Sequence, residues 1–450
     1  MKIRKIKWSN DSILGDLNID VTKDHSTSYN TVIFAGDNGS GKTTILSKLA
    51  TFLNLKDFDF EMIEYVADSG KVFEASKHPG HKSFYRIKSS DGQYIDKNAD
   101  YNNDREKIKD DYDEIRKNGC VFSKARSDFQ TKKISSVTSE TLDNEKYSLD
   151  SKEDFTSLKQ LLIDIETKDN EEYRRINRGN PTTLSEEEFY KSNSNMYRFK
   201  HAINEFFEYI KFDSIKTIDG AKEVVFVKNG KEIKIDTLST GEKQIVFRGV
   251  YLLKNRDLLT GGTVLIDEPE LSMHPKWQKK ILKYYQNLFT INNNQMVQLF
   301  IATHSEYVLE SALSDSDSLV VVLKQNSGSI IAHKITVPFV LPQVTSAEIN
   351  YVAFDLYSVD YHIQLFNYVP DKLSLSNDAV TTIDAAISSH ASYDPTIHNK
   401  PSSYTNPRNG NTTNYQTISA YIRNEIHHAS RTYTHEDMVI STKLLIKISS

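Results

Sequence analysis

A short glycine-rich segment constrains the fold of this chain more than any other feature of its sequence. Residues 36–43 read Gly-Asp-Asn-Gly-Ser-Gly-Lys-Thr, the pattern Gly-x4-Gly-Lys-Thr. An apolar run at residues 31–35 precedes the segment, and a helical pattern at residues 44–50 follows it. Between a strand and a helix, the backbone N–H groups of such a loop and the positive end of the helix dipole surround phosphate groups. The sequence therefore predicts a phosphate-binding loop on an α/β fold.

The side chains of this loop indicate a nucleoside triphosphate together with Mg²⁺. We expect Lys42 to neutralise the β- and γ-phosphates and the Thr43 hydroxyl to bind the metal. The residues expected to contact the nucleotide are Gly36, Asn38, Gly39, Ser40, Gly41, Lys42, Thr43 and Thr44.

Two further apolar runs, at residues 263–266 and 297–302, are each followed by side chains that can bind a metal or take part in catalysis. Asp267 and Glu268 follow the first run, and His304 follows the second. Short aliphatic runs of this kind are typical of buried parallel strands, whose carboxyl ends gather the ligand-binding loops. We expect Asp267 to share the Mg²⁺ with Thr43, and Glu268 to orient or deprotonate the attacking water. His304 is expected to reach the γ-phosphate.

Composition excludes several classes of protein. The 450 residues carry 56 Lys and Arg against 61 Asp and Glu, a formal net charge of −5, which argues against a wholly basic nucleic-acid coat. One cysteine, Cys120, allows neither an internal disulfide nor a cysteine-based zinc module. The chain has neither an apolar signal segment at its start nor a run long enough to span a membrane. We expect a soluble cytoplasmic protein.

Residues 238–244, Leu-Ser-Thr-Gly-Glu-Lys-Gln, place Ser and Gly before a helical pattern, which predicts a second anion-binding helix terminus. The four segments at 36–43, 238–244, 267–268 and 304 together resemble the Walker A, signature, Walker B and switch-histidine motifs of ABC-type ATPases. The run Asp-Glu-Pro-Glu-Leu-Ser-Met-His-Pro at 267–275 resembles the SMC/RecF/OLD-like, AAA_21-like branch rather than membrane transporters. The resemblance covers residues 36–304.

The resemblance implies a homodimer, or a higher homo-oligomer, that sandwiches two ATP molecules. Ser239 and Gly241, with the neighbouring Glu242, would contact nucleotide bound to the other subunit, and residues 270–274 would face across the dimer. The family's Q-loop has no clear match, and Arg126 and Gln130 are its candidates. The long coiled coil of SMC proteins is absent from the sequence.

The resemblance and the composition give a domain plan: an ABC-type P-loop NTPase core with a mixed or parallel sheet, split by an insertion. Residues 1–80 and 216–340 are expected to form the core, residues 81–215 a charged and mostly helical insertion, and residues 341–450 a helical C-terminal region. Further expected elements are a solvated helix at 104–117, a helix at 195–210, a hairpin at Asn229–Gly230, a helix at 346–368, a polar stretch at 390–414, and a final helix pair whose second member begins at a capping box, Thr434–Asp437.

The C-terminal region carries one further pattern. Arg423 and His427 lie four residues apart in a predicted helix, and His428 adjoins them. Arginine with histidine can bind a phosphodiester and move protons. The spacing Arg-Asn-x-x-x-His is similar to the active motif of HEPN ribonucleases, but a capped structural helix with a basic surface, or an interface, explains it better.

Three functions are consistent with these patterns. The first is an ATP-driven switch subunit that controls a separate effector, a nuclease or toxin, as in the Septu, retron-associated and PARIS ATPases of bacterial anti-phage defence that the motifs resemble. The second is an ATP-gated ribonuclease acting through Arg423 and His428. The third is a RecF-like, ATP-dependent DNA-binding repair protein, in which nucleic acid would meet a local basic face. None of the three involves a membrane.

Overall fold

The computed structural model describes the chain in two compact units, Met1–Lys334 and Ile335–Ser450. The described residues are 1–450 without 25–26, 90–91, 101–107, 109, 126–146, 150–154, 180–187, 189–193, 255–259, 292–293, 327–328, 336–338, 406–409 and 429–431. Within this part of the chain, no helix is long and apolar enough to cross a membrane.

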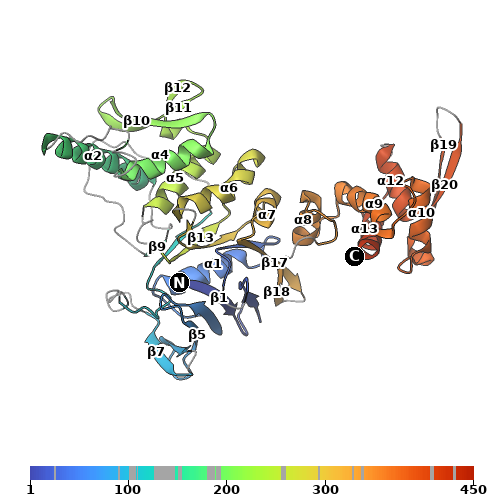
Figure 1. Ribbon diagram of the computed structural model, residues 1–450, viewed down its shortest axis with the longest axis horizontal. Helices are drawn as coiled ribbons and strands as arrows, with labels where there is room; N and C mark the ends of the chain where they lie inside the picture. The colour runs from blue at the N-terminus through green and yellow to red at the C-terminus, as the bar shows by residue number, and fades with distance from the viewer. Residues whose placement is uncertain are drawn as a thin grey trace. The chain divides into compact units, whose positions relative to one another are not determined.

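A seven-stranded sheet forms the centre of the first unit (Figure 1). Its order is β18-β17-β3-β16-β13-β8-β9, and every neighbouring pair is parallel except β17 and β18. The strands are β3 (Thr31–Ala35), β8 (Cys120–Ser123), β9 (Tyr147–Leu149), β13 (Thr263–Asp267), β16 (Gln298–Ala302), β17 (Ser318–Asn326) and β18 (Ser329–Lys334). The predicted strands β3, β16 and β13 are central neighbours and fully buried, because both faces of the sheet are covered. The predicted α/β class is confirmed.

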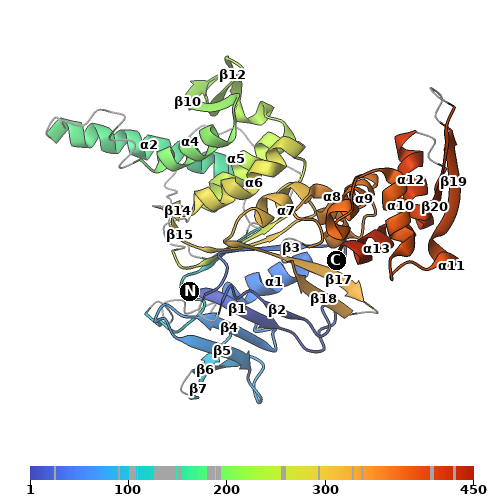
Figure 2. The same cartoon turned by 45° about the vertical axis from the view of Figure 1, so that its right-hand side comes forward.

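A second, antiparallel sheet has the order β2-β1-β4-β5-β6-β7. Its strands are β1 (Lys2–Lys7), β2 (Asn18–Asp20), β4 (Met62–Val66), β5 (Val72–Lys77), β6 (Phe84–Ser89) and β7 (Tyr94–Asn98). Helix α1 (Lys42–Leu53) lies between the two sheets (Figure 2). Leu49 of α1, Phe34 of β3 and Ile63 of β4 belong to one buried cluster. The helix that begins at the phosphate loop is therefore held from both sides.

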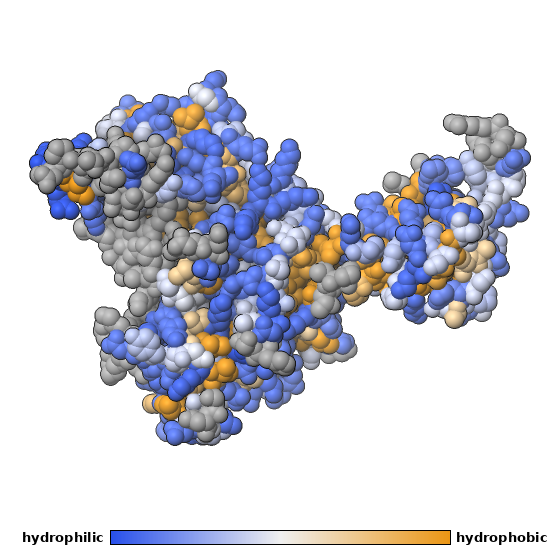
Figure 3. Space-filling view, viewed as in Figure 1, coloured by the Kyte–Doolittle hydropathy of each residue, from blue (hydrophilic) through white to orange (hydrophobic). Residues whose placement is uncertain are grey.

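The surface of this unit is mostly hydrophilic on the face shown in Figure 3. Apolar areas lie over the outer strands of the antiparallel sheet, where Val72, Phe84 and Ile95 are exposed.

Further helices and a small sheet complete the first unit. They are α2 (Phe155–Gly179), α4 (Asn195–Phe206), β10 (Ile210–Ile218), β11 (Ala221–Lys228), β12 (Lys231–Lys234), the 3₁₀ turn η3 (Ile235–Thr237), α5 (Thr240–Leu253), α6 (Pro275–Leu288), the short pair β14 (Thr290–Ile291) and β15 (Asn294–Gln295), and α7 (Glu306–Leu313). Helix α5 contacts β8, and α7 contacts β3 and β17. The hairpin prediction is confirmed, since Asn229 and Gly230 connect β11 to β12 with φ angles of 50° and 76°.

The segment expected to be a charged helical insertion contains core elements as well. Strands β6, β7 and β8 precede α2 in this segment and belong to the two large sheets. The predicted helix at 104–117 is wrong for its described part, because residues 110–117 form turns. Glu114 and Arg116 are fully buried there, with Arg116 Nε donating to Glu114 Oε1 at 2.7 Å. The two side chains neutralise each other inside the protein. They are therefore buried, whereas the sequence predicts that they lie on the solvated face of a helix.

The second unit is mainly helical. Its elements are α8 (Ser346–Phe354), α9 (Val359–Leu373), α10 (Val380–Ser389), α11 (Pro395–His398), β19 (Asn399–Thr405), β20 (Thr412–Thr417), α12 (Ile418–His427) and α13 (His435–Ser449). The single helix predicted at 346–368 is in fact two, because Asp355 adopts φ 52° and ends α8. The polar stretch predicted at 390–414 forms α11 and most of an antiparallel hairpin. The capping box at Thr434 and Asp437 is confirmed.

Candidate functional site

The loop at residues 36–43 connects β3 directly to the first turn of α1. Gly36 has φ 138°, and a Cβ atom there would collide with the carbonyl oxygen of Leu323 on β17, so the close approach requires glycine. Lys42 Nζ donates to the carbonyl oxygens of Gly36 and Asp37, both at 2.8 Å, and to Ser40 Oγ at 3.2 Å. Burial lowers the pKa of Lys42 to about 8, against the opposing negative charges of the carboxylates nearby. A bound phosphate would favour its protonated form.

The hydroxyl of Thr43 and the carboxylate of Asp267 face each other across the end of β13. Thr43 Oγ1 donates to Asp267 Oδ2 at 3.0 Å and lies 3.2 Å from Oδ1. Burial raises the pKa of Asp267, and the hydrogen bond from Thr43 opposes this shift. Hydroxyl and carboxylate oxygens are the donors that Mg²⁺ prefers. The residues present therefore fit the metal that the sequence predicts, at the two predicted ligands.

Glu268 and His304 lie in the loops that follow the neighbouring strands β13 and β16, and their side chains lie side by side. His304 Nε2 is 3.8 Å from Glu268 Oε1, and both side chains are about one-third exposed. Burial and the positive charge of Lys42 lower the pKa of His304. Glu268 adopts φ 44°, a left-handed conformation that is costly for a non-glycine residue. Such strain is a feature of functional loops, and here it places the carboxylate beside the histidine.

The sequence assigns Glu270 only to the loop expected to face across a dimer. In the structure its carboxylate is buried between the loop after β13 and the loop after β16. Its Oε1 accepts a hydrogen bond of 2.7 Å from the backbone N–H of His304. Its Oε2 is buried without a hydrogen-bond partner among the described residues. Burial raises the pKa of Glu270. This carboxylate ties the loop after β13 to the loop after β16.

Sequence reasoning missed Arg248 altogether. This residue of α5 is buried, and its Nη1 and Nη2 donate to the carbonyl oxygens of Glu268 at 3.1 Å and Asp267 at 3.0 Å. Nη2 also contacts the carbonyl oxygen of Lys124, just after β8. An arginine in the otherwise apolar stretch Ile245–Leu253 was the available signal, because a buried cation needs acceptors.

The segment at 238–244 forms the start of α5. Ser239 caps the helix, accepting from Glu242 N at 3.4 Å while its own N–H donates to Glu242 Oε2 at 2.8 Å. The other oxygen of Glu242 accepts from Lys228 Nζ at 2.6 Å, so both carboxylate oxygens are engaged within the subunit. Gly241 is buried, and a Cβ atom there would lie 2.6 Å from the carbonyl oxygen of Ser272. Ser239 remains exposed.

The remaining predicted site residues lie elsewhere. Arg126 and Gln130 fall outside the described residues. In the second unit, Arg423 Nη1 donates to Asn424 Oδ1 at 3.3 Å, and His427 is the last residue of α12. His428 caps the helix and stacks on Tyr404, with ring centroids 3.9 Å apart. The helical placement of Arg423 and His427 agrees with the sequence, and the ribonuclease role stays a prediction.

Residues 32–310 match the protein family AAA_21, described as "AAA domain, putative AbiEii toxin, Type IV TA system". The matched segment contains the phosphate loop, the start of α5, and the loops after β13 and β16. The chain belongs to the AAA_21 family. This membership, the parallel sheet and the phosphate loop make the first unit an ABC-type P-loop ATPase domain.

Two curated relatives of this AAA_21 protein are named for retrons. "Retron Vc95 probable ATPase" of Vibrio cholerae serotype O1 biovar El Tor is 35% identical over 107 residues, 22% of this chain and 20% of the relative. "Retron Ec83 probable ATPase" of Escherichia coli is 31% identical over 106 residues, 22% of this chain and 19% of the relative. The matched segments span about a fifth of each relative's length.

Solved structures that resemble the chain include SMC head domains. One, a "SmcHead bound to the C-winged helix domain of ScpA", has a TM-score of 0.41 and 12% identity, covering 75% of this chain and 99% of that one. The SMC head domain from Thermotoga maritima has a TM-score of 0.38 and 14% identity, covering 75% and 100%.

Proposed function

We propose that this AAA_21 protein binds and hydrolyses ATP as a homodimer or larger homo-oligomer, and that it serves as the switch subunit of a bacterial anti-phage defence system. The observation that carries the ATPase part is the pairing of Thr43 with Asp267, next to Lys42 on one side and Glu268 with His304 on the other. The residues proposed to bind phosphate, to bind the metal and to activate water thus lie close together, which supports the proposal.

In the proposed reaction, the N–H groups of the phosphate loop and Lys42 hold the triphosphate. Thr43 and Asp267 would hold Mg²⁺, which when bound neutralises charge on the phosphates. Glu268 orients the attacking water and accepts its proton, while His304 reaches the γ-phosphate. Glu270 and Arg248 do not touch the nucleotide; they position the backbone of the loops that carry these groups.

The oligomer part of the proposal rests on the start of α5. The N-terminus of a helix attracts anions, and Ser239 and Thr240 at this N-terminus are exposed. Within the described residues, no hydrogen bond or ion pair joins Ser239 to the phosphate loop. A second subunit whose nucleotide meets this exposed terminus would complete both sites at once, and ATP would then favour the assembled state.

The defence role and the separate effector, a nuclease or toxin, are inferred from the names of the two retron ATPases, whose length this chain matches only in part. The test is to express the chain with its neighbouring genes and challenge the cells with phage. Protection that disappears with Lys42→Ala would support the role. Protection that persists without a working phosphate loop would contradict it.

The ATPase itself is tested by phosphate release from Mg²⁺-ATP with the purified full chain. Lys42→Ala should abolish turnover, because the phosphates lose their main cation. Lys23→Ala, a change at a surface ion pair with Asp317, is the matched control and should turn over normally. Equal rates in the two variants would overturn the proposal.

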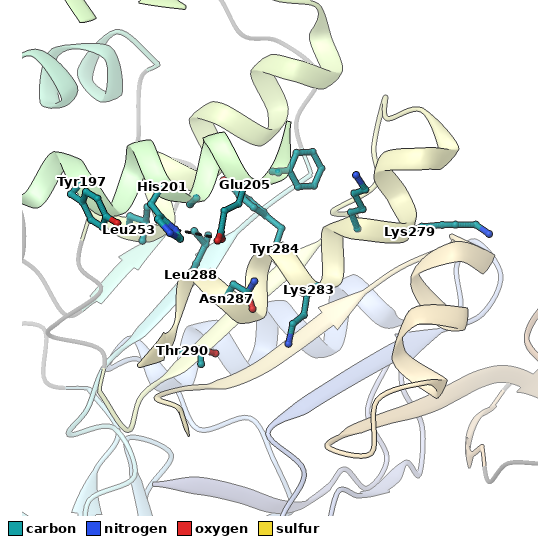
Figure 4. A pocket seen from close by; sticks show the side chains of 13 residues that line it. Tyr197, His201, Glu205, Leu253, Lys279, Lys283, Tyr284, Asn287, Leu288 and Thr290 are labelled. Carbon is teal, nitrogen blue, oxygen red and sulfur yellow. Dashed lines mark ion pairs between the residues drawn. The ribbon is translucent and has the colours of Figure 1, made fainter. Parts of the chain in front are cut away.

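One surface favours a second function, ATP-dependent binding of nucleic acid. Helix α6 carries no acidic residue and presents four exposed lysines, Lys276, Lys279, Lys280 and Lys283. Beside them, residues of α4 and α6 line a cavity of about 680 Å³. In Figure 4, Tyr197, His201 and Glu205 come from α4, and Lys283, Asn287 and Leu288 from α6.

Two of these lysines have carboxylate partners at the surface. Lys279 pairs with Glu310 at 3.5 Å, and Lys280 pairs with Glu208 at 2.6 Å. Lys276 and Lys283 make no ion pair within the described residues and are the cations open to phosphate. This function predicts DNA binding that requires ATP, weakens with salt and is lost in a Lys276→Glu, Lys283→Glu double variant. DNA binding indifferent to ATP would count against it.

A further inference from the structure

The cavity of about 680 Å³ that α4 and α6 line is large enough for a small organic group, since sites for small molecules measure about 300–1,000 Å³. On α4, Tyr197, His201 and Glu205 line it at intervals of four residues, so they share one face of the helix over about 12 Å. On α6, Lys283 and Asn287 line it with the same spacing. Two rows of side chains therefore border the cavity.

The two rows run in opposite directions. Glu208, just after α4, pairs with Lys280 in the first half of α6 at 2.6 Å. Figure 4 shows Tyr197, near the start of α4, at the end of the cavity where Leu288 of α6 lies. The start of α4 is therefore beside the end of α6. As a result, aromatic rings line one end of the cavity and lysines line the other.

The ring end of the cavity consists of Tyr197, His201, Asn287 and Leu288. The ring centroids of Tyr197 and His201 are 5.5 Å apart, and the side chain of His201 is about half exposed. Asn287 is exposed, and its side-chain amide makes no hydrogen bond to the described residues. Rings beside an amide that can both donate and accept suit a flat heterocycle with polar edges, such as a nucleic-acid base.

The lysine end of the cavity consists of Lys279, Lys280 and Lys283. Among the described residues that line the cavity, Glu205 is the only carboxylate, and it lies 3.4 Å from His201 Nδ1. Lys279 and Lys280 pair with glutamates that lie outside the lining. Exposed ion pairs of this kind are weak, so a phosphate can replace either partner. Because cations outnumber carboxylates here, this end suits an anionic group.

A base with a neighbouring phosphate is the unit of every nucleic acid, but the cavity discriminates between strands. In a duplex the base is paired and stacked, and it could enter a cavity only by turning out of the helix, which costs a few kcal/mol. An unpaired base needs no such step. Proteins that bind single strands combine a basic groove with aromatic rings, as this cavity does. The cavity therefore fits a single strand better than a duplex.

We propose that this cavity takes one unpaired nucleotide of a single-stranded nucleic acid, with its base against Tyr197 and His201 and its phosphate at the lysine end. The inference rests on the second proposed function, nucleic-acid binding, and names the class of nucleic acid. The lysines of α6 hold the phosphates of the strand, and the rings of α4 select strands that present an unstacked base.

The test measures the fluorescence anisotropy of labelled strands titrated with the full chain in the presence of Mg²⁺-ATP. The probes are a strand of about 16 thymidines, an abasic strand and a duplex of the same length. The parent should bind the thymidine strand more tightly than the duplex. It should also bind it about 5- to 150-fold more tightly than the abasic strand, which corresponds to about 1–3 kcal/mol of stacking. A uridine strand distinguishes RNA from DNA as the source.

A Tyr197→Ala, His201→Ala double variant should bind the thymidine strand as weakly as the abasic strand, with its affinity for the duplex unchanged. Because Tyr197 is partly buried, His201→Ala is also made alone and should lose part of the preference. Tyr197→Phe keeps the ring and should bind like the parent. ATP hydrolysis at the parent rate shows that each variant is folded.

The matched control is Tyr112→Ala, which removes a ring that is 61% exposed and lies outside the cavity. It should keep the parent's preference for the thymidine strand. Equal affinity of the parent for the thymidine and abasic strands would overturn the inference, as would an unchanged preference in the double variant. In both cases nucleic acid still binds, and the second proposed function stands. A parent that binds none of the probes would overturn that function, and this inference with it.

Discussion

Arg248 Nη1 donates a hydrogen bond of 3.1 Å to the backbone carbonyl oxygen of Glu268. The arginine sits on α5, nine residues after the exposed Ser239 at the start of that helix. Glu268 is the residue proposed to orient the attacking water. One side chain therefore links the helix expected to face a second subunit to the loop expected to perform hydrolysis. This link gives a physical route by which assembly could alter turnover.

Replacing Arg248 should separate hydrolysis from nucleotide binding. In Arg248→Ala the carbonyl groups of Asp267 and Glu268 lose their buried donor, and the free energy of unfolding should fall by about 2–4 kcal/mol. Turnover should fall at least about tenfold, because a small displacement of Glu268 misplaces the water. ATP affinity should change little. Phosphate release, calorimetry and urea unfolding measure the three quantities.

The matched control for that experiment is Arg175→Ala, whose side chain is 76% exposed. It should resemble the parent in all three measurements. An Arg248→Ala variant that hydrolyses ATP at the parent rate would show that the link between α5 and the loop has no role in turnover.

Glu268→Gln should trap an ATP-bound assembly. The amide keeps the size of the side chain but cannot accept the proton of the attacking water, so hydrolysis stops while ATP continues to bind. Light scattering should then report a mass that increases with ATP and stays high. The control is Glu310→Gln, at a surface ion pair with Lys279, which should assemble only transiently. A mass that ignores ATP in Glu268→Gln would contradict the switch.

Ser239→Arg should leave ATP binding nearly intact and abolish hydrolysis, because the bulky cation would block the exposed terminus of α5 against a second subunit. Loss of the helix cap itself should cost only about 1 kcal/mol. Ser239→Ala removes the same cap without the bulk and therefore isolates that cost. Normal turnover in Ser239→Arg would break the model in which each site is completed by another chain.

The parts of the site that depend on residues close together in the chain could be predicted from the sequence. The phosphate loop lies between a strand and a helix that contribute their own signals, and Asp267 directly follows an aliphatic strand. The strands β3, β13 and β16 are each followed by a loop that carries polar side chains. A parallel arrangement is therefore expected, because it brings these three loops to the same edge of the sheet. For the same reason the cap at Thr434 could be predicted, since its partner Asp437 lies three residues away.

Features that depend on distant contacts could not be predicted. Arg248 donates hydrogen bonds to backbone carbonyl groups. Because every residue has a carbonyl group, the sequence does not show which residues accept these bonds. The charged run at 104–117 resembles a solvated helix because nothing local shows that Arg116 meets Glu114, Tyr85 and Phe52 in the interior. Likewise, the sequence does not show that the turn at His78–Phe84 lines the same cavity as α1, because β5 and β6 bring the two segments together only in the folded protein.

Changing Arg423 and His428 together to Ala tests the ribonuclease alternative. The switch proposal expects unchanged ATP hydrolysis and unchanged protection against phage, because both residues lie in the second unit. The stacked Tyr404 and His428 rings would lose only a surface contact, costing about 1 kcal/mol. Growth arrest and RNA cleavage are measured in cells and with purified protein. Loss of protection with intact ATPase activity would favour the ribonuclease instead.

His362 should make the second unit sensitive to acid. Its ring is fully buried with Nε2 2.8 Å from Ser441 Oγ, and burial lowers its pKa from 6.5 to about 3. Between these values the unfolded chain binds a proton that the folded chain does not, so the free energy of unfolding falls as the pH drops below 6.5. The loss is about 1.4 kcal/mol per pH unit, or about 2 kcal/mol at pH 5.

Urea unfolding of the full chain at neutral pH and near pH 5 measures this dependence. His362→Gln, which cannot be protonated, should be less stable than the parent at neutral pH but should lose less stability on acidification. His435→Gln changes an exposed histidine of the same unit and should keep the parent's pH dependence. If His362→Gln and the parent lose equal stability between the two conditions, the buried ring is not the source of the acid sensitivity.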